Sequence, residues 1–252
     1  MFKATLKEPS VFVDSILTIG ELIDEAVFKL RKDGISMMAT DRAMVAAVDF
    51  NLSAGAFDKY EIENDQSIGL NVTNMLTILK RVKGDDSLTL ELKGNKLEFV
   101  LDGGSKRKFV VPLIDLSEGE LPQTDQLEKQ YTSKVTMKPE EMQKGLDDAE
   151  VITDNVLLEA SGNKFTMRAE GDLNKAELEL EMGKNDSLLE ILTTGNVKSR
   201  YPLNYLKKMM KAGKTVDSVV LKFATDFPMK IEFNNEDKSR LHFVIAPRVS
   251  DN

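Results

Sequence analysis

The sequence contains no cysteine and a single histidine. The absence of cysteine excludes disulfides, thiolate nucleophiles and cysteine-ligated metals. With one histidine and no thiol, neither a nucleophile–histidine–acid triad nor a zinc site can be assigned. His242 lies in an alternating segment, RLHFVI, which favours a structural role. We therefore expect no catalytic residue, no metal and no cofactor.

Long apolar runs are also missing. No stretch of about 18 apolar residues is present, which predicts no membrane span. The N-terminus, MFKATLKEPS, lacks the apolar centre and cleavage site of a signal peptide. Hydrophobic residues make up 41% and charged residues 30% of the chain, as in ordinary globular proteins. We expect a cytoplasmic protein with no membrane partner.

A polar, acidic segment, LSEGELPQTDQLEKQ, interrupts the chain near its middle. Gly119 and Pro122 break any regular period there. The 252 residues are enough for one large core or two moderate ones. We interpret the segment as a connector and predict an N-terminal domain over 1–116, the connector over 117–131 and a C-terminal domain over 132–252.

The second half of the chain repeats the order of the first. Glu8-Pro9-Ser10, where Pro suits a first helical turn and Ser can cap it, is mirrored by Lys138-Pro139-Glu140, 130 residues later. An apolar helical period over 72–82 is repeated over 202–212. Such a long repeat, present twice, indicates a duplicated domain rather than a solenoid.

Each copy reads as two helices and about eight short strands joined by tight turns. Runs of strands with short connections predict antiparallel sheets, and the helices are expected to pack on one face of them. The predicted fold class is therefore a duplicated α+β domain.

The charges of the helices differ within each copy. The second helix of each half and its exit are basic, whereas the net charge of the chain is −8. Lys80 aligns with Lys211 and Lys83 with Lys214, and Lys207, Lys211 and Lys214 follow a helical spacing that puts them on one face. A solvated helix face would explain one such helix. Recurrence at aligned positions favours a surface for phosphate instead.

Several segments in this order resemble the proliferating cell nuclear antigen family in its archaeal form. They are MFKA at the N-terminus, LIDEA, DGISM and ATD in the first third, then IGLN and ILK, and APRV near the C-terminus. The resemblance covers the whole chain. It implies a DNA clamp fold, in which a trimeric ring with helices lining its hole encircles duplex DNA without catalysing a reaction.

The resemblance also implies partners and sites. It implies a processivity role for DNA polymerase, tethering of flap endonuclease and DNA ligase through short peptides, and loading by a clamp-loader ATPase. The expected DNA-facing residues are Lys80, Arg81, Lys83, Lys144, Lys207, Lys208, Lys211 and Lys214. Helix 10–20 has Val13, Asp14 and Gly20 where many members have lysines, so weaker DNA contact is expected there.

The family's partner pocket lies beneath the connector. By position, its wall here would be Met44, Val45, Ala47, Leu121, Pro122, Leu127, Pro228, Ala246, Pro247, Arg248 and Val249. Leu121 and Leu127 both fit as the connector residue that faces the pocket. Ordinary core packing is the competing explanation for Val45 and Ala47.

Two regular strand segments, Lys106–Leu113 and Lys175–Met182, are of opposite charge. An unpaired regular strand is an aggregation hazard, so we predict that they pair between subunits. The expected interface residues are Arg107, Val110, Val111, Leu178 and Leu180.

The alternative functions are an antiparallel α+β enzyme for an acidic or nucleotide substrate, and a subunit that works only in a heteromeric ring.

Overall fold

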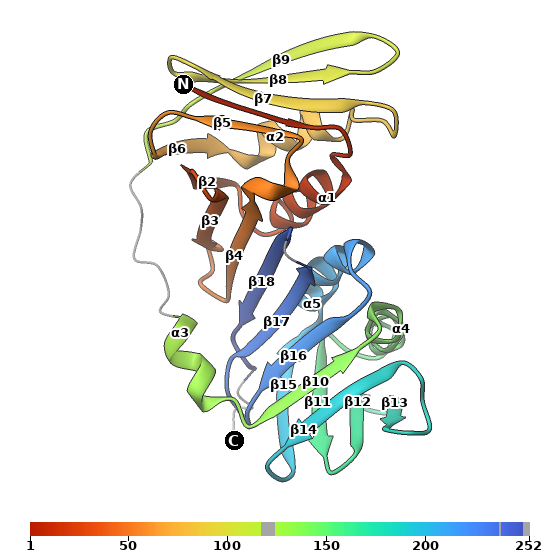
Figure 1. Ribbon diagram of the computed structural model, residues 1–252. Helices are drawn as coiled ribbons and strands as arrows, with labels where there is room; N and C mark the ends of the chain where they lie inside the picture. Colours follow the sequence, from red (N-terminus) through yellow and green to blue (C-terminus); the bar gives the residue numbers. More distant parts are fainter. Residues whose placement is uncertain (117–123, 237, 249–252) are drawn as a thin grey trace. The chain divides into compact units, whose positions relative to one another are not determined.

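The structure is a computed structural model that describes residues 1–116, 124–236 and 238–248 (Figure 1). Leu121, Pro122 and Val249, three residues of the expected partner pocket, lie outside the described residues. The chain divides into two compact units, one of Met1–Arg42, Val48–Leu121 and Asn235–Leu241 and the other of Ala43–Ala47, Pro122–Asn234 and His242–Asn252. The domain boundaries drawn from the sequence stay a prediction.

The N-terminal half contains two α-helices and nine strands among its described residues. In chain order they are β1 (Phe2–Leu6), α1 (Ser10–Ile19), β2 (Glu25–Arg31), β3 (Gly34–Thr40), β4 (Ala46–Ser53), the 3-10 turn η1 (Ala54–Ala56), β5 (Lys59–Ile62), β6 (Gln66–Asn71), α2 (Val72–Leu79), β7 (Ser87–Lys93), β8 (Lys96–Asp102) and β9 (Lys106–Pro112).

After the short connector helix α3 (Thr124–Leu127) and the 3-10 turn η2 (Glu128–Gln130), the C-terminal half repeats this order. Its elements are β10 (Ser133–Met137), α4 (Pro139–Glu150), β11 (Asn155–Ser161), β12 (Lys164–Glu170), β13 (Lys175–Glu181), β14 (Leu188–Thr193), β15 (Val197–Pro202), α5 (Leu203–Met210), the 3-10 turn η3 (Lys211–Thr215), β16 (Val219–Phe223), β17 (Met229–Asn235) and β18 (Ser239–Ile245).

The strand orders confirm the duplication. One sheet of the N-terminal half has the order β5-β1-β7-β8-β9, and the C-terminal half has β14-β10-β16-β17-β18 in the corresponding places. The remaining strands of the N-terminal half follow the order β4-β3-β2-β6, and those of the C-terminal half follow β13-β12-β11-β15. Adding nine to each strand number converts one order into the other. The predicted duplicated α+β fold with antiparallel sheets is confirmed, and the described residues of each half form nine strands in place of the roughly eight expected.

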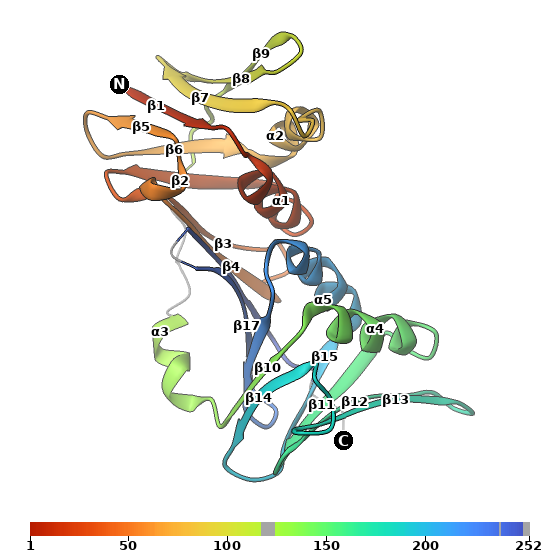
Figure 2. The same ribbon diagram turned by 45° about the vertical axis from the view of Figure 1, so that its right-hand side comes forward.

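In each half the helices lie together on one sheet. In the C-terminal half α4 packs beside α5 over β11, β12 and β13 (Figure 2). In the N-terminal half α1 packs against α2, which contacts β2 and β6. Close approach needs small residues: a Cβ on Gly145 of α4 would meet Met167 Sδ at 2.6 Å, and one on Gly20 would meet Leu76 Cδ1 at 2.5 Å. Gly20 is thus explained by helix packing.

The helices α1 and α4, which occupy equivalent places in the two halves, begin differently. Pro139 is the first residue of α4, as expected. In α1 Pro9 occupies the N-cap position and Ser10 is already helical, with no capping side chain, so the prediction that Ser10 caps the helix was wrong. Among the described residues, no helix is long and apolar enough to cross a membrane.

Candidate functional sites

The basic residues of the N-terminal half follow α2 rather than lying along it. Asn71 caps the helix, its Oδ1 accepting from the Asn74 amide at 2.9 Å. The helix ends at Leu79, three residues earlier than the periodicity predicted; Lys80 is its C-cap, and the Arg81 and Val82 amides bond to carbonyls three residues back. Lys80, Arg81 and Lys83 are all exposed. Cations at a helix C-terminus also stabilise the helix by about 0.3–1 kcal/mol, so these residues have a local role as well.

The C-terminal half has the same arrangement. The buried side of α5 is Leu203, Leu206, Met209 and Met210, as the pattern predicted. The α-helix ends at Met210 and the chain continues as the 3-10 turn η3, in which residues three apart lie on the same side, so Lys211 and Lys214 share a side there. Lys211 is the C-cap of α5, which matches Lys80 in α2.

Two of the expected DNA-facing cations are paired with acids of α4. Lys207 contacts Asp147 Oδ1 at 3.0 Å and the carboxylate of Glu150. Lys144 contacts Glu141 Oε1 at 2.6 Å. The hydrogen bond to Glu150, and then that to Asp147, raises the pKa of Lys207. In this half the acids of α4 therefore offset part of the positive charge.

Two further positions bear on the expected DNA-facing surface, Lys208 on α5 and Val13 on α1. The Lys208 ammonium lies 5.9 Å from the centre of the Tyr205 ring, within cation–π range. On α1, Val13 is buried and belongs to the core, so it is not a position at which a lysine would meet DNA.

The described part of the expected partner pocket lies within one compact unit. The Ala246 amide donates to Val45 O at 2.9 Å, and the Arg248 amide donates to Arg200 O at 2.7 Å. The amides of Ala246 and Arg248 are therefore used within the chain, and Pro247 has no N–H. Within residues 246–248 a bound peptide could pair only with carbonyl groups.

The side chains of this pocket differ widely in exposure. Met44 is 81% exposed and has a φ of 55°, which is unusual for a residue with a Cβ. Ala47 is only 8% exposed, so core packing accounts for it. Pro228, Ala246 and Pro247 are half-buried, and Leu127 at the end of α3 is also half-buried.

The two strands expected at the subunit interface are both edge strands, since β9 ends the five-stranded order and β13 ends the four-stranded order. The Leu113 amide donates to Asn95 O at 2.9 Å. Because pairing alternates along an antiparallel ladder, the amides of Lys106, Lys108 and Val110 point to the open side of β9. Pro112 occupies the next such position, where no donor is lost.

The same counting on β13 starts from Met182, whose amide donates to Asn163 O at 2.8 Å. The outward amides are then those of Glu177, Glu179 and Glu181, and that of Glu181 already donates to Asn185 Oδ1 at 2.8 Å. Leu180 is 2% exposed and directs its amide to β12, so intramolecular packing accounts for it.

On β9, only Val110 of the predicted apolar interface residues is well exposed. Val111 is buried. Arg107 pairs with the buried carboxylate of Asp86, and it also donates to Arg81 O at 3.1 Å. The hydrogen bond from Arg107 lowers the pKa of Asp86. This contact ties β9 to the turn after α2, a link that sequence reasoning missed.

His242 has the structural role expected, because its Nε2 lies 2.7 Å from Asn234 Oδ1. Within the described ranges no cluster of three or more metal-ligating side chains is found. Another contact that sequence reasoning missed is that of Glu128, which lies 3.2 Å from Lys222 and also meets Lys230. No local pattern signals it, since the lysines are 94 and 102 residues away.

Comparison with known proteins identifies the family with which this chain shares its sequence. The model of the proliferating cell nuclear antigen N-terminal domain matches residues 1–118, and that of its C-terminal domain matches residues 126–248. The DNA polymerase sliding clamp 1 of Thermococcus kodakarensis is 38% identical over 252 residues, 99% of each chain. The DNA polymerase sliding clamp of Pyrococcus furiosus is 38% identical with the same coverage.

Solved structures agree. The crystal structure of PCNA from Thermococcus kodakaraensis superposes with a TM-score of 0.90 at 29% identity, covering 98% of this chain and 100% of that one. The PCNA2–PCNA3 complex of Sulfolobus tokodaii gives a TM-score of 0.89 at 29% identity, covering 98% and 99%. Two copies of one α+β unit, each with its helices on one sheet, define a DNA clamp fold. The chain belongs to the proliferating cell nuclear antigen family.

Proposed function

We propose that the protein is a sliding clamp that closes into a trimeric ring around duplex DNA. It is not an enzyme; in this role it keeps DNA polymerase on its template and tethers flap endonuclease and DNA ligase, after loading by the clamp loader. The observation that carries the proposal is the recurrence of exposed cations at the exit of the second helix in both halves, Lys80 with Lys83 and Lys211 with Lys214, in a family whose curated members are named sliding clamps.

The mass of the purified chain in solution tests the assembly. A value of about three times 28.2 kDa supports a homotrimer. A monomer that becomes a ring only with other chains would support the heteromeric alternative, for which the PCNA2–PCNA3 complex is a precedent.

Neutralising the acids beside Lys207 should strengthen DNA binding. In an Asp147→Asn, Glu150→Gln variant the Lys207 ammonium loses both partners and becomes available to phosphate. We expect the affinity for duplex DNA at low salt to rise, and its salt slope to steepen by up to about 0.9 for each new phosphate contact. Fluorescence anisotropy over a salt series measures both. The double variant Asp65→Asn, Asp186→Asn, at two exposed positions outside the helices, is the matched two-charge control, and equal gains from it would point to net charge instead.

Partners should dock near Met44, whose neighbour Val45 accepts a hydrogen bond from the Ala246 amide of the C-terminal segment. Such a peptide would insert apolar side chains beside Met44, Pro228 and Leu127. Because Ala47 is buried, a bulky residue there would disturb the core, so Met44→Glu is the better test. We expect it to weaken binding of a polymerase-derived peptide by about tenfold or more, while the melting temperature stays unchanged.

Isothermal titration measures this loss, and Met44→Leu, which keeps an apolar side chain of similar size, serves as the control. Wild-type affinity of Met44→Glu would place the peptide elsewhere.

A further inference from the structure

Three lysines face one another across neighbouring strands of the C-terminal half. Lys134 on β10 lies opposite Lys222 on β16, and Lys222 lies opposite Lys230 on β17. We call them the lysine row. Neighbouring strands are about 4.8 Å apart. Like charges placed directly opposite one another destabilise a sheet, so the lysine row requires counter-charges.

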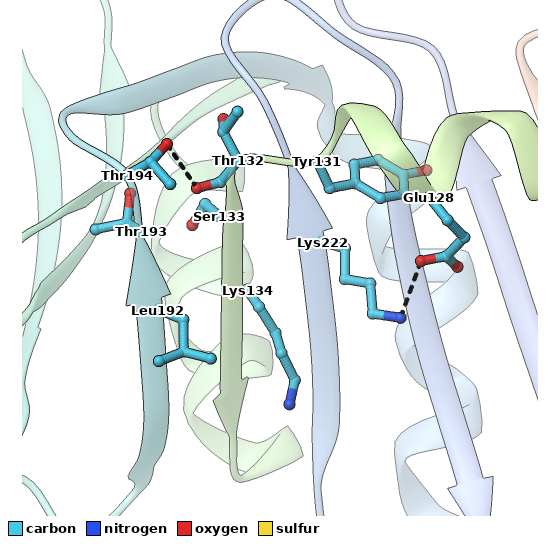
Figure 3. Close-up of a pocket in the computed structure, with 9 residues that line it drawn as sticks. All are labelled: Glu128, Tyr131, Thr132, Ser133, Lys134, Leu192, Thr193, Thr194 and Lys222. Atoms are coloured by element: carbon cyan, nitrogen blue, oxygen red, sulfur yellow. Dashed lines mark hydrogen bonds and ion pairs between the residues drawn. The ribbon is translucent and has the colours of Figure 1, made fainter.

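Two of the counter-charges come from the sheet itself. Glu190 on β14 contacts Lys134 at 2.5 Å. Glu232 on β17 contacts Lys222 at 2.8 Å and Lys230 at 3.2 Å. The third comes from the connector, because Glu128 of η2 contacts both Lys222 and Lys230. Figure 3 shows the ion pair between the Glu128 carboxylate and Lys222; both residues line a pocket of about 430 Å³.

In the corresponding sheet of the N-terminal half, the strands themselves supply all the counter-charges, without an acid from the described part of the connector. There the facing residues are Lys3, Glu91 and Glu98, on β1, β7 and β8. Lys93 pairs with Glu91 and Glu98, and Lys108 contacts Glu98 at 2.7 Å. All of these charges are supplied by the strands. The C-terminal half has lysines where its counterpart has acids, and this difference creates the place that Glu128 occupies.

The contact is partly shielded from water. The side chains of Lys230 and Glu232 are only 14% and 10% exposed, and that of Glu128 is 35% exposed. Burial alone would raise the pKa of Glu128, but hydrogen bonds and charge from Lys230 and Lys222 outweigh it and lower the pKa. Glu128 is therefore ionised at neutral pH, and its pairs are less screened than those of exposed residues.

We propose that Glu128 is a positioning residue: by docking on the lysine row it holds residues 124–130 of the connector in place and so pre-orders Leu127 of the partner site. The inference rests on the proposed function, in which the bound peptide lies beside Leu127. If residues 124–130 are already held in place, they lose less conformational freedom when a peptide binds, and the affinity is higher for that reason. Tyr131, whose ring packs edge-on against Phe227 at 6.0 Å, holds the next residues independently.

Amide hydrogen exchange tests the docking directly in the full chain. Glu128→Gln keeps the size of the side chain and removes its charge. We expect the amides of residues 124–130 to exchange about tenfold faster, because the uncharged Gln side chain cannot form the charge-assisted hydrogen bonds to Lys222 and Lys230. Glu190→Gln is the matched control. It also removes one acid that pairs with the lysine row, namely the partner of Lys134, but this acid lies on β14 and not on the connector. We expect it to leave these amides unchanged.

Salt separates an ionic contact from a packing effect. Exchange of 124–130 in the wild type should quicken with added NaCl, and in Glu128→Gln this dependence should vanish. Unchanged exchange in Glu128→Gln, or an equal change in Glu190→Gln, would overturn the proposal.

Titration with a polymerase-derived peptide then tests the consequence. We expect binding to Glu128→Gln to be about threefold to tenfold weaker and binding to Glu190→Gln to match the wild type. Equal affinity of the two variants would overturn the pre-ordering. A wild type that binds no peptide would instead refute the proposed partner site, while the exchange experiment would still decide whether Glu128 docks the connector.

Discussion

Val110→Pro should yield a monomer of 28.2 kDa in place of the trimer. The amide of Val110 points to the open side of β9, where a strand of the next subunit would accept it. Proline removes that donor and places a ring at the strand edge. The ladder between β9 and β8 keeps its hydrogen bonds, because they come from the alternate residues. Dissociation should therefore occur without unfolding.

The partner strand can be tested in the same way at Glu179, whose amide points outward from β13. A proline at Leu180 would be a poor choice, since it would remove a hydrogen bond to β12 and disturb a buried side chain. The charges of the two edges also match: β9 brings Lys106 and Lys108, and β13 brings three glutamates. We expect Glu179→Pro to give monomers as well.

Multi-angle light scattering measures the mass, and circular dichroism verifies that each variant is folded. Val110→Ala shortens the side chain but retains the N–H, so it should remain trimeric. A folded Val110→Pro variant that still forms trimers would show that β9 does not contribute its edge to the ring.

Replacing Lys80, Arg81 and Lys83 with alanine should abolish most of the clamp's stimulation of polymerase processivity. These side chains are exposed at the turn after α2, so their removal leaves the core unchanged. Removing one phosphate contact lowers the slope of log affinity against log salt by about 0.9. In a trimer each substitution is present in all three subunits, so the decrease in slope is correspondingly larger. The mass of the assembly should not change.

The control removes the same charge elsewhere. Lys32, Lys96 and Lys238 are exposed lysines outside the helix exits. Their triple alanine variant should keep nearly the wild-type salt slope and processivity. Equal decreases in the two triple variants would mean that net charge, and not the helix exits, attracts DNA.

The duplication and the class of the fold are encoded in the sequence in a form that can be recognised without coordinates. The apolar period of the helices, the alternation of the strands and an offset of about 130 residues are local or repetitive signals, so they do not depend on knowing which elements are neighbours. They predict the burial of Leu206 and Met209 and the basic exits of α2 and α5. The composition, with one histidine and no cysteine, already pointed away from catalysis.

The contacts that join distant residues follow from the tertiary structure alone. It ends α2 at Leu79, puts Lys207 between two acids of α4, and buries Ala47. It also settles which amides of β9 and β13 face outward, because that depends on the register with β8 and β12. Glu128 meets lysines about a hundred residues away only because β16 and β17 lie side by side under the end of the connector. A periodic sequence specifies which face of an element is apolar, whereas the pairing of charges depends on which elements the fold makes neighbours.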